Sequence, residues 1–263
     1  MNEKEYNELE GLRSSELKQL IDNPAKYKYW QTRRKESSTA LNFGIAYHLL
    51  ALEPHRKDEI VIAPKFSGTG SRAAKAEWEA VNAGKIFVTE SEMLDLRAML
   101  SALREKPEIV SILDAEGKYE AAAQFDIAGV KCKFRADKIT DRIVDLKTAR
   151  SISQHAITKA IVDYGYHISD AFYNIGAVEA GLIEKDMPMQ FIFQDKNPPF
   201  EVVLVTLDDV SRDFAKQQIM YAIEALKQFQ VQNYWPGKYY EPLQVSLPLW
   251  YFKGEEISEE VEF

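Results

Sequence analysis

The segment YEAAAQFDIAGVKCKFRADKITDRIVDLKT, residues 119–148, decides the fold. Its apolar and polar residues alternate with the period of two that is typical of strands, and turn residues divide it twice. Ala128-Gly129 is the expected first turn, and Thr140-Asp141 is the expected second turn. The pattern predicts three consecutive strands, at about 119–127, 130–139 and 142–148.

Helical patterns lie on both sides of this meander. The spacing of apolar residues and of capping residues predicts helices at 39–53, 90–104, 153–181 (with Gly165 as a break) and 208–233. Within 14–30, a short helix capped by Ser14 or Ser15 is expected to stop near Pro24. Two more strands are expected in PMQFIFQD and FEVVLVTL, between the last two helices. This order predicts an α/β fold with a mixed central sheet flanked by helices. No linker requires a second domain, so residues 1–263 are expected to form a single domain.

The composition excludes several classes of protein. The chain has 263 residues, of which 46% are hydrophobic, and a net charge of −8. Its single cysteine, Cys132, excludes an internal disulfide, a zinc site of several thiolates and a four-cysteine iron–sulfur cluster. A reducing, cytoplasmic location is expected. The sequence contains no apolar run of about 18 residues, so no membrane span is expected. The charged start lacks the apolar core of a signal peptide. The acidic end at 253–263 is expected to be solvated.

Three charged residues stand among side chains that otherwise have the pattern of buried strands. Asp145 and Lys147 share one face of the third predicted strand, and Asp137 lies on the second strand, on the same face as Lys133 and Arg135. The tight turn between the strands places the two carboxylates beside each other across the ladder. Adjacent carboxylates stay ionised only if cations compensate them, and Lys147 with a divalent metal such as Mg²⁺ would do so.

A surface salt-bridge cluster is the simpler interpretation of the same residues, because a D-x-K triplet alone is a weak signal. The aspartate pair followed by Lys147, however, resembles the PD-(D/E)XK nuclease motif. Several other segments resemble the RecE (exonuclease VIII) C-terminal nuclease family of phage recombination. These segments are SSELKQLIDNPAKYKYW, LNFGIAYHLLALEP, KFRADKITDRIVDLKTA, YGYHISDAFY and WPGKYY with LPLW. The resemblance covers almost the whole chain and implies a restriction-endonuclease-like core.

The resemblance also implies roles for individual residues. The metal ligands would be His48, the acidic residues Asp137 and Asp145, and the backbone carbonyl of Leu146. Lys147 would be the catalytic lysine. Glu120 stands where the family has an acidic residue before the core strands, so it would bind or orient the metal. For His48, the alternative is a hydrogen-bonded histidine in the core.

Other residues are candidates for contact with DNA. Arg135 would pair with Asp137 or reach a phosphate. Arg72 and Lys75 belong to a Gly/Ser-rich basic loop at 64–76 that leads into a helix, and this loop would either wrap phosphates or be a mobile connection. Tyr173 matches the tyrosine of the family's Y-x-x-Q-x-A-x-Y helix, but Ser169 stands at the glutamine position. Serine has a shorter reach than glutamine, which puts that substrate contact in question.

The implied reaction is Mg²⁺-dependent phosphodiester hydrolysis, with Mn²⁺ as a substitute and with one or two metal ions. The resemblance further implies 5′→3′ degradation of linear double-stranded DNA from its ends. The product would be a 3′ overhang for a RecT-like single-strand annealing protein, and the nuclease would be a homotetrameric ring. Two alternatives remain: another PD-(D/E)XK endonuclease or repair nuclease, and a catalytically silent protein that binds DNA ends.

Overall fold

The structure, a computed structural model, describes residues 3–31, 39–68, 70–239, 241–248 and 251. Five strands of this described part form one sheet in the order β3-β4-β5-β6-β7. Their bounds are Lys118–Ile127, Val130–Ile139, Ile143–Ala149, Gln190–Asp195 and Val202–Val205. Neighbours are antiparallel except β5 and β6, which are parallel. The predicted mixed α/β fold and its strand meander are therefore confirmed, while the acidic end at 253–263 lies outside the described residues.

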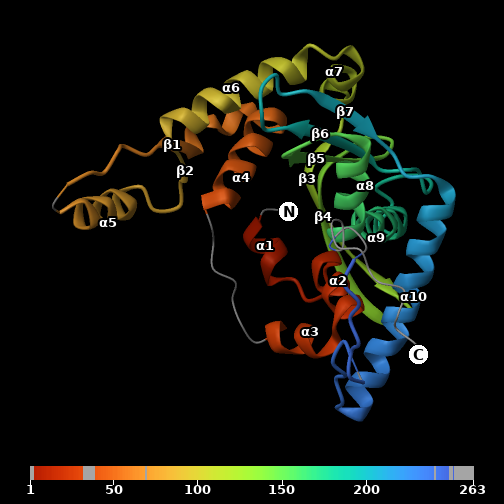
Figure 1. The fold of residues 1–263 in the computed structure, drawn as a ribbon. Coiled ribbons are helices and arrows are strands. Elements are labelled where there is room, and N and C mark those ends of the chain that lie inside the picture. The colour runs from red at the N-terminus through yellow and green to blue at the C-terminus, as the bar shows by residue number, and fades with distance from the viewer. Residues whose placement is uncertain (1–2, 32–38, 69, 240, 249–250, 252–263) are drawn as a thin grey trace, which may run out of the picture.

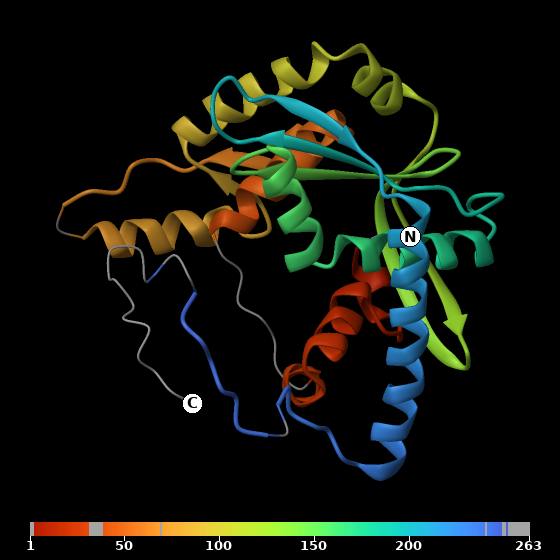
Figure 2. The same ribbon diagram turned by 45° about the vertical axis from the view of Figure 1, so that its right-hand side comes forward.

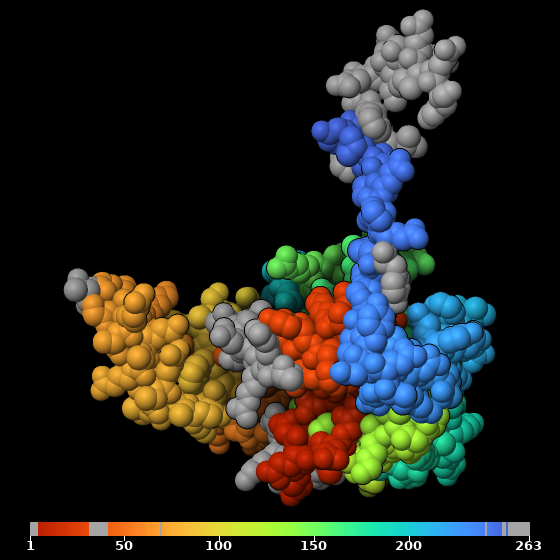
Figure 3. Space-filling view, turned by 90° about the horizontal axis from the view of Figure 1, so that it is seen from below, coloured from red at the N-terminus to blue at the C-terminus, as the bar shows by residue number. Residues whose placement is uncertain are grey.

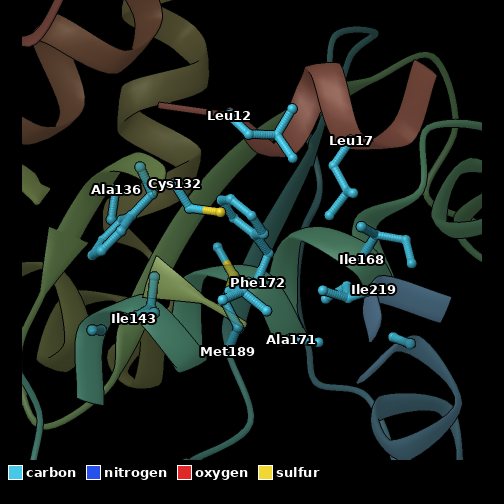
Figure 4. Close-up of a cluster of buried hydrophobic side chains, with 14 of the residues drawn as sticks. Leu12, Leu17, Cys132, Ala136, Ile143, Ile168, Ala171, Phe172, Met189 and Ile219 are labelled. Carbon is cyan, nitrogen blue, oxygen red and sulfur yellow. The ribbon is translucent and has the colours of Figure 1, made fainter. Parts of the chain in front are cut away.

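Helices cover both faces of the sheet (Figure 1). On one face, α2 (Ser14–Asp22), α9 (Tyr166–Glu179) and α10 (Asp209–Gln232) enclose the larger hydrophobic core. Figure 4 shows the meeting of these elements, with Leu17, Phe172 and Ile219 pointing toward one another. The opposite face carries α4 (Thr39–Leu52), α6 (Glu90–Arg104) and α7 (Pro107–Asp114) over the second core.

The structure corrects several predicted helices. The first helix, α2, ends at Asp22, which confirms the stop predicted near Pro24. Residues 24–31 form a separate helix, α3 (Pro24–Gln31), because Pro24 cannot continue the first helix but suits the start of the second. The N-cap of α2 is Arg13 rather than the predicted Ser14 or Ser15. Gly165, with φ = +60°, separates α8 (Gln154–Asp163) from α9 as predicted. Short elements were not predicted: α1 (Glu3–Glu8), α7, the 3₁₀ helix η1 (Pro54–Glu59), β1 (Ile60–Ile62) and β2 (Ile86–Val88).

A small module projects from the body of the protein (Figures 2 and 3). It consists of the parallel pair β1–β2 and helix α5 (Ser71–Val81), and Trp78 packs against Phe66 and Phe87. Helix α4 was expected to be buried, but only part of it is: among its described side chains Ala46, Tyr47, Leu49, Ala51 and Leu52 are buried, while Ile45 is exposed. No described helix has the length and apolar character needed to cross a membrane.

The sheet splits between β4 and β5. These strands pair only at Lys138–Val144 and Ile139–Ile143, next to the turn that joins them. Farther along β4, Leu12 occupies the freed edge: its N–H donates to Lys131 O, and its carbonyl accepts from Lys133 N–H. The chain reaches this position because Gly11 has φ = +145°, and a Cβ there would lie 2.9 Å from the Cys132 carbonyl carbon. The segment that leads into α2 is thereby fixed beside the split.

Gly176 makes the close packing of α9 on β3 and β4 possible. A Cβ at this residue would lie 2.7 Å from Phe125 Cε1 and 2.9 Å from Phe134 Cδ1. Gly176→Ala is therefore expected to destabilise the protein by about 1–3 kcal/mol, since overpacking outweighs the gain in helix propensity. Urea unfolding measures this change. Gly44→Ala in α4 is the control: its Cβ would meet nothing within 4 Å, so equal or greater stability is expected. Equal losses for both variants would contradict the packing argument.

Candidate active site

The split between β4 and β5 brings Asp137 to α4 and to the backbone of β5. The next pair in the ladder would join Asp137 to Asp145, but the strands have already separated. Instead, Leu146 N–H donates to Asp137 Oδ2 at 2.9 Å, and His48 Nδ1 lies 3.3 Å from the same oxygen. Burial would raise the pKa of Asp137, but the charges of His48 and Lys147 and these hydrogen bonds hold that pKa well below the usual range. Asp137 is therefore a carboxylate at neutral pH.

Asp145 and Lys147 form an ion pair on the neighbouring strand, as their shared face predicts. Asp145 Oδ2, the oxygen that faces the Lys147 ammonium, is buried. Burial and the nearby Asp137 carboxylate raise the pKa of Asp145 more than Lys147 lowers it. Burial would lower the pKa of Lys147, but the two carboxylates raise it by more. Lys147 therefore remains an ammonium, which suits electrostatic stabilisation better than general-base catalysis.

The regular alternation of side chains is interrupted where Asp137 lies. Phe134 and Ala136 face the larger core, whereas the Lys138 ammonium bonds to Leu113 O at 2.6 Å on the opposite side of the sheet. Across the ladder, Glu120 has φ = +47°, a left-handed conformation that is costly for a residue with a side chain. In both strands, the alternation of side chains between the two sides of the sheet is therefore broken at this point. Lys133, Arg135 and Asp137 do not share one regular face of the sheet as predicted.

Arg135 pairs with Glu120 at 2.8 Å, rather than with Asp137 as one interpretation of the sequence had it. Burial and neighbouring carboxylates raise the pKa of Glu120 although Arg135 lowers it. The charge of Asp137 contributes to this shift, so Glu120 lies close enough to sense the candidate site. The Glu120 carboxylate nonetheless points toward Arg135 on the neighbouring strand.

Helix α9 places Ser169 and Tyr173 on one face, as their spacing of four residues requires. The Tyr173 ring packs 5.3 Å from that of Phe134, and burial with the charge of Asp145 raises the pKa of its hydroxyl. Ser169 Oγ accepts a hydrogen bond from Lys18 Nζ at 2.6 Å. Both predicted residues therefore lie near the carboxylates, and Lys18 of α2 is a neighbour that the sequence did not indicate.

Arg72 and Lys75 are not brought to this site. Both lie in the projecting helix α5 rather than in the preceding loop, and Lys75 lies 3.7 Å from Glu79. In Figure 1, α5 is at the far left, whereas β4 and β5 are central. A large groove of about 1180 Å³ lies beside the site, between α2, α8 and α10, but none of Asp137, Asp145, Lys147 or His48 lines it. Its lining includes the carboxylates Asp22, Asp163 and Asp208, of which Asp22 pairs with Lys238 and Asp163 with Lys159.

The donor atoms at the split suit a divalent cation that prefers oxygen. Two carboxylates, the Leu146 carbonyl and the His48 imidazole are the ligand types that Mg²⁺ or Mn²⁺ takes. Among the described residues, no three acidic, histidine or cysteine side chains converge as a metal cluster. Mg²⁺ does not require such a cluster, because one or two carboxylates suffice when water and substrate oxygens complete its shell. The residues present therefore fit the implied metal.

His48 gives the site an expected dependence on pH. Burial lowers the pKa of His48, but the Asp137 carboxylate raises it by more, to above the ordinary 6.5. The pair therefore stabilises the metal-free protein fully below pH 6.5, and this stability is lost as the pH rises through the folded pKa. In EDTA, the difference in unfolding free energy between wild type and His48→Gln should shrink from pH 6 upward. With Mn²⁺ the trend should reverse, because a ligand imidazole must lose its proton. A difference independent of pH would contradict the pairing.

Comparisons with known proteins agree with the fold. A crystal structure from Eubacterium rectale, described as a "putative exonuclease", superposes with a TM-score of 0.65 over 97% of this chain and 98% of that chain, at 12% identity. A phage related exonuclease from Haemophilus somnus 129PT is a weaker match, with a TM-score of 0.36, 12% identity and coverage of 86% and 97%. The first likeness shows a shared fold.

The search of curated proteins found no match. Residues 13–241 match the family described as "PDDEXK-like domain of unknown function (DUF3799)", and this range includes both strands of the split and helices α4 and α9. The match covers most of the 263 residues. The chain therefore belongs to this family of PDDEXK-like domains.

Proposed function

We propose that the protein is a metal-dependent exodeoxyribonuclease that degrades linear double-stranded DNA. One observation carries this proposal: the split in the sheet gathers Asp137, Asp145, Lys147 and His48 within one buried site. The PDDEXK-like family and the fold shared with an exonuclease-like structure support the same reaction class. Degradation from 5′ to 3′, a 3′ overhang for a RecT-like annealing protein and a ring-shaped tetramer rest on the resemblance to the RecE family alone.

The residues of the site would divide the reaction between them. Asp137, Asp145, the Leu146 carbonyl and His48 would hold Mg²⁺, and Mn²⁺ would replace it. When bound, the metal supplies Lewis-acid activation of water and of the scissile phosphate. Lys147, protonated between two carboxylates, orients the attacking water and stabilises the negative charge that develops on the phosphate oxygens. Leu146 N–H keeps Asp137 in position throughout.

Two residues near the site would limit the negative charge that a DNA phosphate meets there. Tyr173 is partly buried, and its pKa is raised by burial and by the charge of Asp145, so it stays a neutral phenol that adds no further negative charge. The pairing of Glu120 with Arg135 likewise keeps a third carboxylate neutralised at rest. A DNA phosphate that enters the split therefore meets Lys147 and the metal ligands before any uncompensated acid.

The proposal is tested with linear duplex DNA and a closed circle of the same sequence, each in Mg²⁺ and in EDTA. The expected result is Mg²⁺-dependent loss of the linear duplex only, with a 5′ label released before a 3′ label. Cleavage of the circle would instead indicate an endonuclease of the same fold. If the ends are bound but neither DNA is cut, the protein is a silent end-binding protein and the proposed activity is wrong.

A further inference from the structure

Lys18 lies beside the candidate site but belongs to none of its ion pairs. Its ammonium donates to Ser169 Oγ at 2.6 Å, and Ser169 Oγ lies 3.3 Å from Ser14 Oγ. The ring of Tyr166 connects this group to the catalytic lysine: Lys18 Nζ lies 5.6 Å from the ring centroid and Lys147 Nζ lies 5.3 Å from it. Two cations from different elements, α2 and β5, therefore approach one aromatic ring.

Lys18 has no acidic partner in the part of the chain that the structure describes. Every ion pair recorded there joins other residues, and the hydrogen-bonding partner of Lys18 is a neutral hydroxyl. Burial and the charge of Lys147 together lower the pKa of Lys18 to about 8, although the charge of Asp145 raises it. A half-buried ammonium beside a second ammonium is electrostatically unfavourable unless an anion joins them.

The backbone fixes the direction of this side chain. Helix α2 is anchored in the larger core by Leu17 and Leu20, which are fully buried. The methylene groups of Lys18 then lie across Gly165, at the turn between α8 and α9, where a Cβ would be 3.2 Å from Lys18 Cδ. Lys18 is thus held against the start of α9, where Ser169 and Tyr166 are located.

We propose that Lys18, with the hydroxyls of Ser169 and Ser14, binds a backbone phosphate of DNA adjacent to the phosphate that is cleaved at the split. An ammonium with hydroxyl donors is a common phosphate-binding set, and a phosphate held between Lys18 and the site would relieve the repulsion between the two lysines. This phosphate would lie on the side of Lys18 that faces Tyr166 and Lys147, because both ammonium groups approach that ring. This inference rests on the proposed nuclease function and extends it to a second phosphate.

The test uses short linear duplexes in which one backbone phosphate at a time, along the first nucleotides of each strand, is replaced by an uncharged methylphosphonate. Binding is measured by fluorescence anisotropy in Ca²⁺, which takes the same oxygen ligands as Mg²⁺, and in EDTA. Wild type should lose about tenfold in affinity at one position next to the cleaved bond. Lys18→Met should bind unmodified DNA about tenfold more weakly than wild type does, and the methylphosphonate at that position should not weaken its binding further. The slope of its log affinity against log salt concentration should be smaller by about one than that of wild type.

Three variants separate this role from a structural one. Lys18→Arg should restore most of the binding, because it keeps the charge. Ser169→Ala should show a smaller loss at the same phosphate. Lys238→Met is the control, since Lys238 lines the same groove and pairs with Asp22; its affinity should be unchanged. In Mg²⁺, Lys18→Met should raise KM more than it lowers kcat.

The outcomes distinguish this inference from the proposed function. If wild type cleaves linear DNA but no single phosphate near the cut is sensitive, the phosphate site is wrong and the nuclease stands. The same holds if Lys18→Met and wild type lose affinity equally at every position. If wild type neither binds nor cleaves DNA in any of these conditions, the proposed function and the phosphate site are both wrong.

Discussion

Replacing Lys147 with methionine is expected to slow Mg²⁺-dependent degradation of linear duplex DNA about 100- to 1,000-fold, the usual effect of removing one preorganised charge from a transition state. Its ammonium pairs with Asp145, and the carboxylates keep it protonated. Methionine preserves much of the volume of the side chain but removes this charge. Single-turnover assays with end-labelled DNA measure the effect on the chemical step directly.

Two controls separate a catalytic role of Lys147 from a general effect of lost charge. Lys159→Met removes an exposed ammonium from α8, where it pairs with Asp163, and activity should stay within about twofold. Binding of Lys147→Met to DNA should fall far less than its cleavage rate, because one phosphate contact carries only part of the affinity. A variant that cleaves at the wild-type rate would show that Lys147 is a structural cation only.

The second large effect is expected in a buried ion cluster between α9 and α10. Arg212, which is 5% exposed, donates from Nε to Asp170 Oδ1 at 3.1 Å and also pairs with Asp186. The other oxygen of Asp170 accepts from Met189 N–H, directly before β6. Arg212→Met leaves Asp170 buried without its cation, so a loss of about 3–5 kcal/mol in unfolding free energy is expected.

The pH dependence of this variant identifies the cause. Burial raises the pKa of Asp170 even with Arg212 present. A carboxyl with a raised folded pKa binds more protons in the folded state, so the defect of Arg212→Met should be smaller at pH 5 than at pH 8. Lys216→Met is the matched control: Lys216 lies 2.9 Å from Asp186 but is much more exposed, and a change below about 1 kcal/mol is expected. Equal effects of the two substitutions would contradict the account of the cluster.

The central strands were predictable because their signals are local. Alternation over 119–148 and the turn at Ala128-Gly129 place the strands within one or two residues of those observed. The break at Gly165 is equally local, since only a residue without a Cβ adopts its backbone easily. Short elements such as α1 and β1 carry too few residues for a period to be recognised.

The shape of the site was less predictable, because it depends on contacts between distant segments. The sequence placed Asp137 opposite Asp145 in a regular ladder. In the structure, the last pair between β4 and β5 is Lys138–Val144, and Leu12 pairs with β4 at Cys132 instead. The left-handed Glu120 also has no signature in its residue type. Lys18 was missed for the same reason: its role depends on Ser169, which lies 151 residues away in the chain.

The central claim is that the split holds a divalent metal ion, and calorimetric titration with Mn²⁺ tests it most directly. Wild type and Asp141→Asn, in which a neighbouring exposed aspartate is replaced, should bind Mn²⁺ equally well. Asp137→Asn keeps an acceptor for Leu146 N–H but removes the charge, and its affinity should fall by at least about tenfold. If Asp137→Asn binds Mn²⁺ as tightly as wild type, or if wild type binds none, the split is not a metal site.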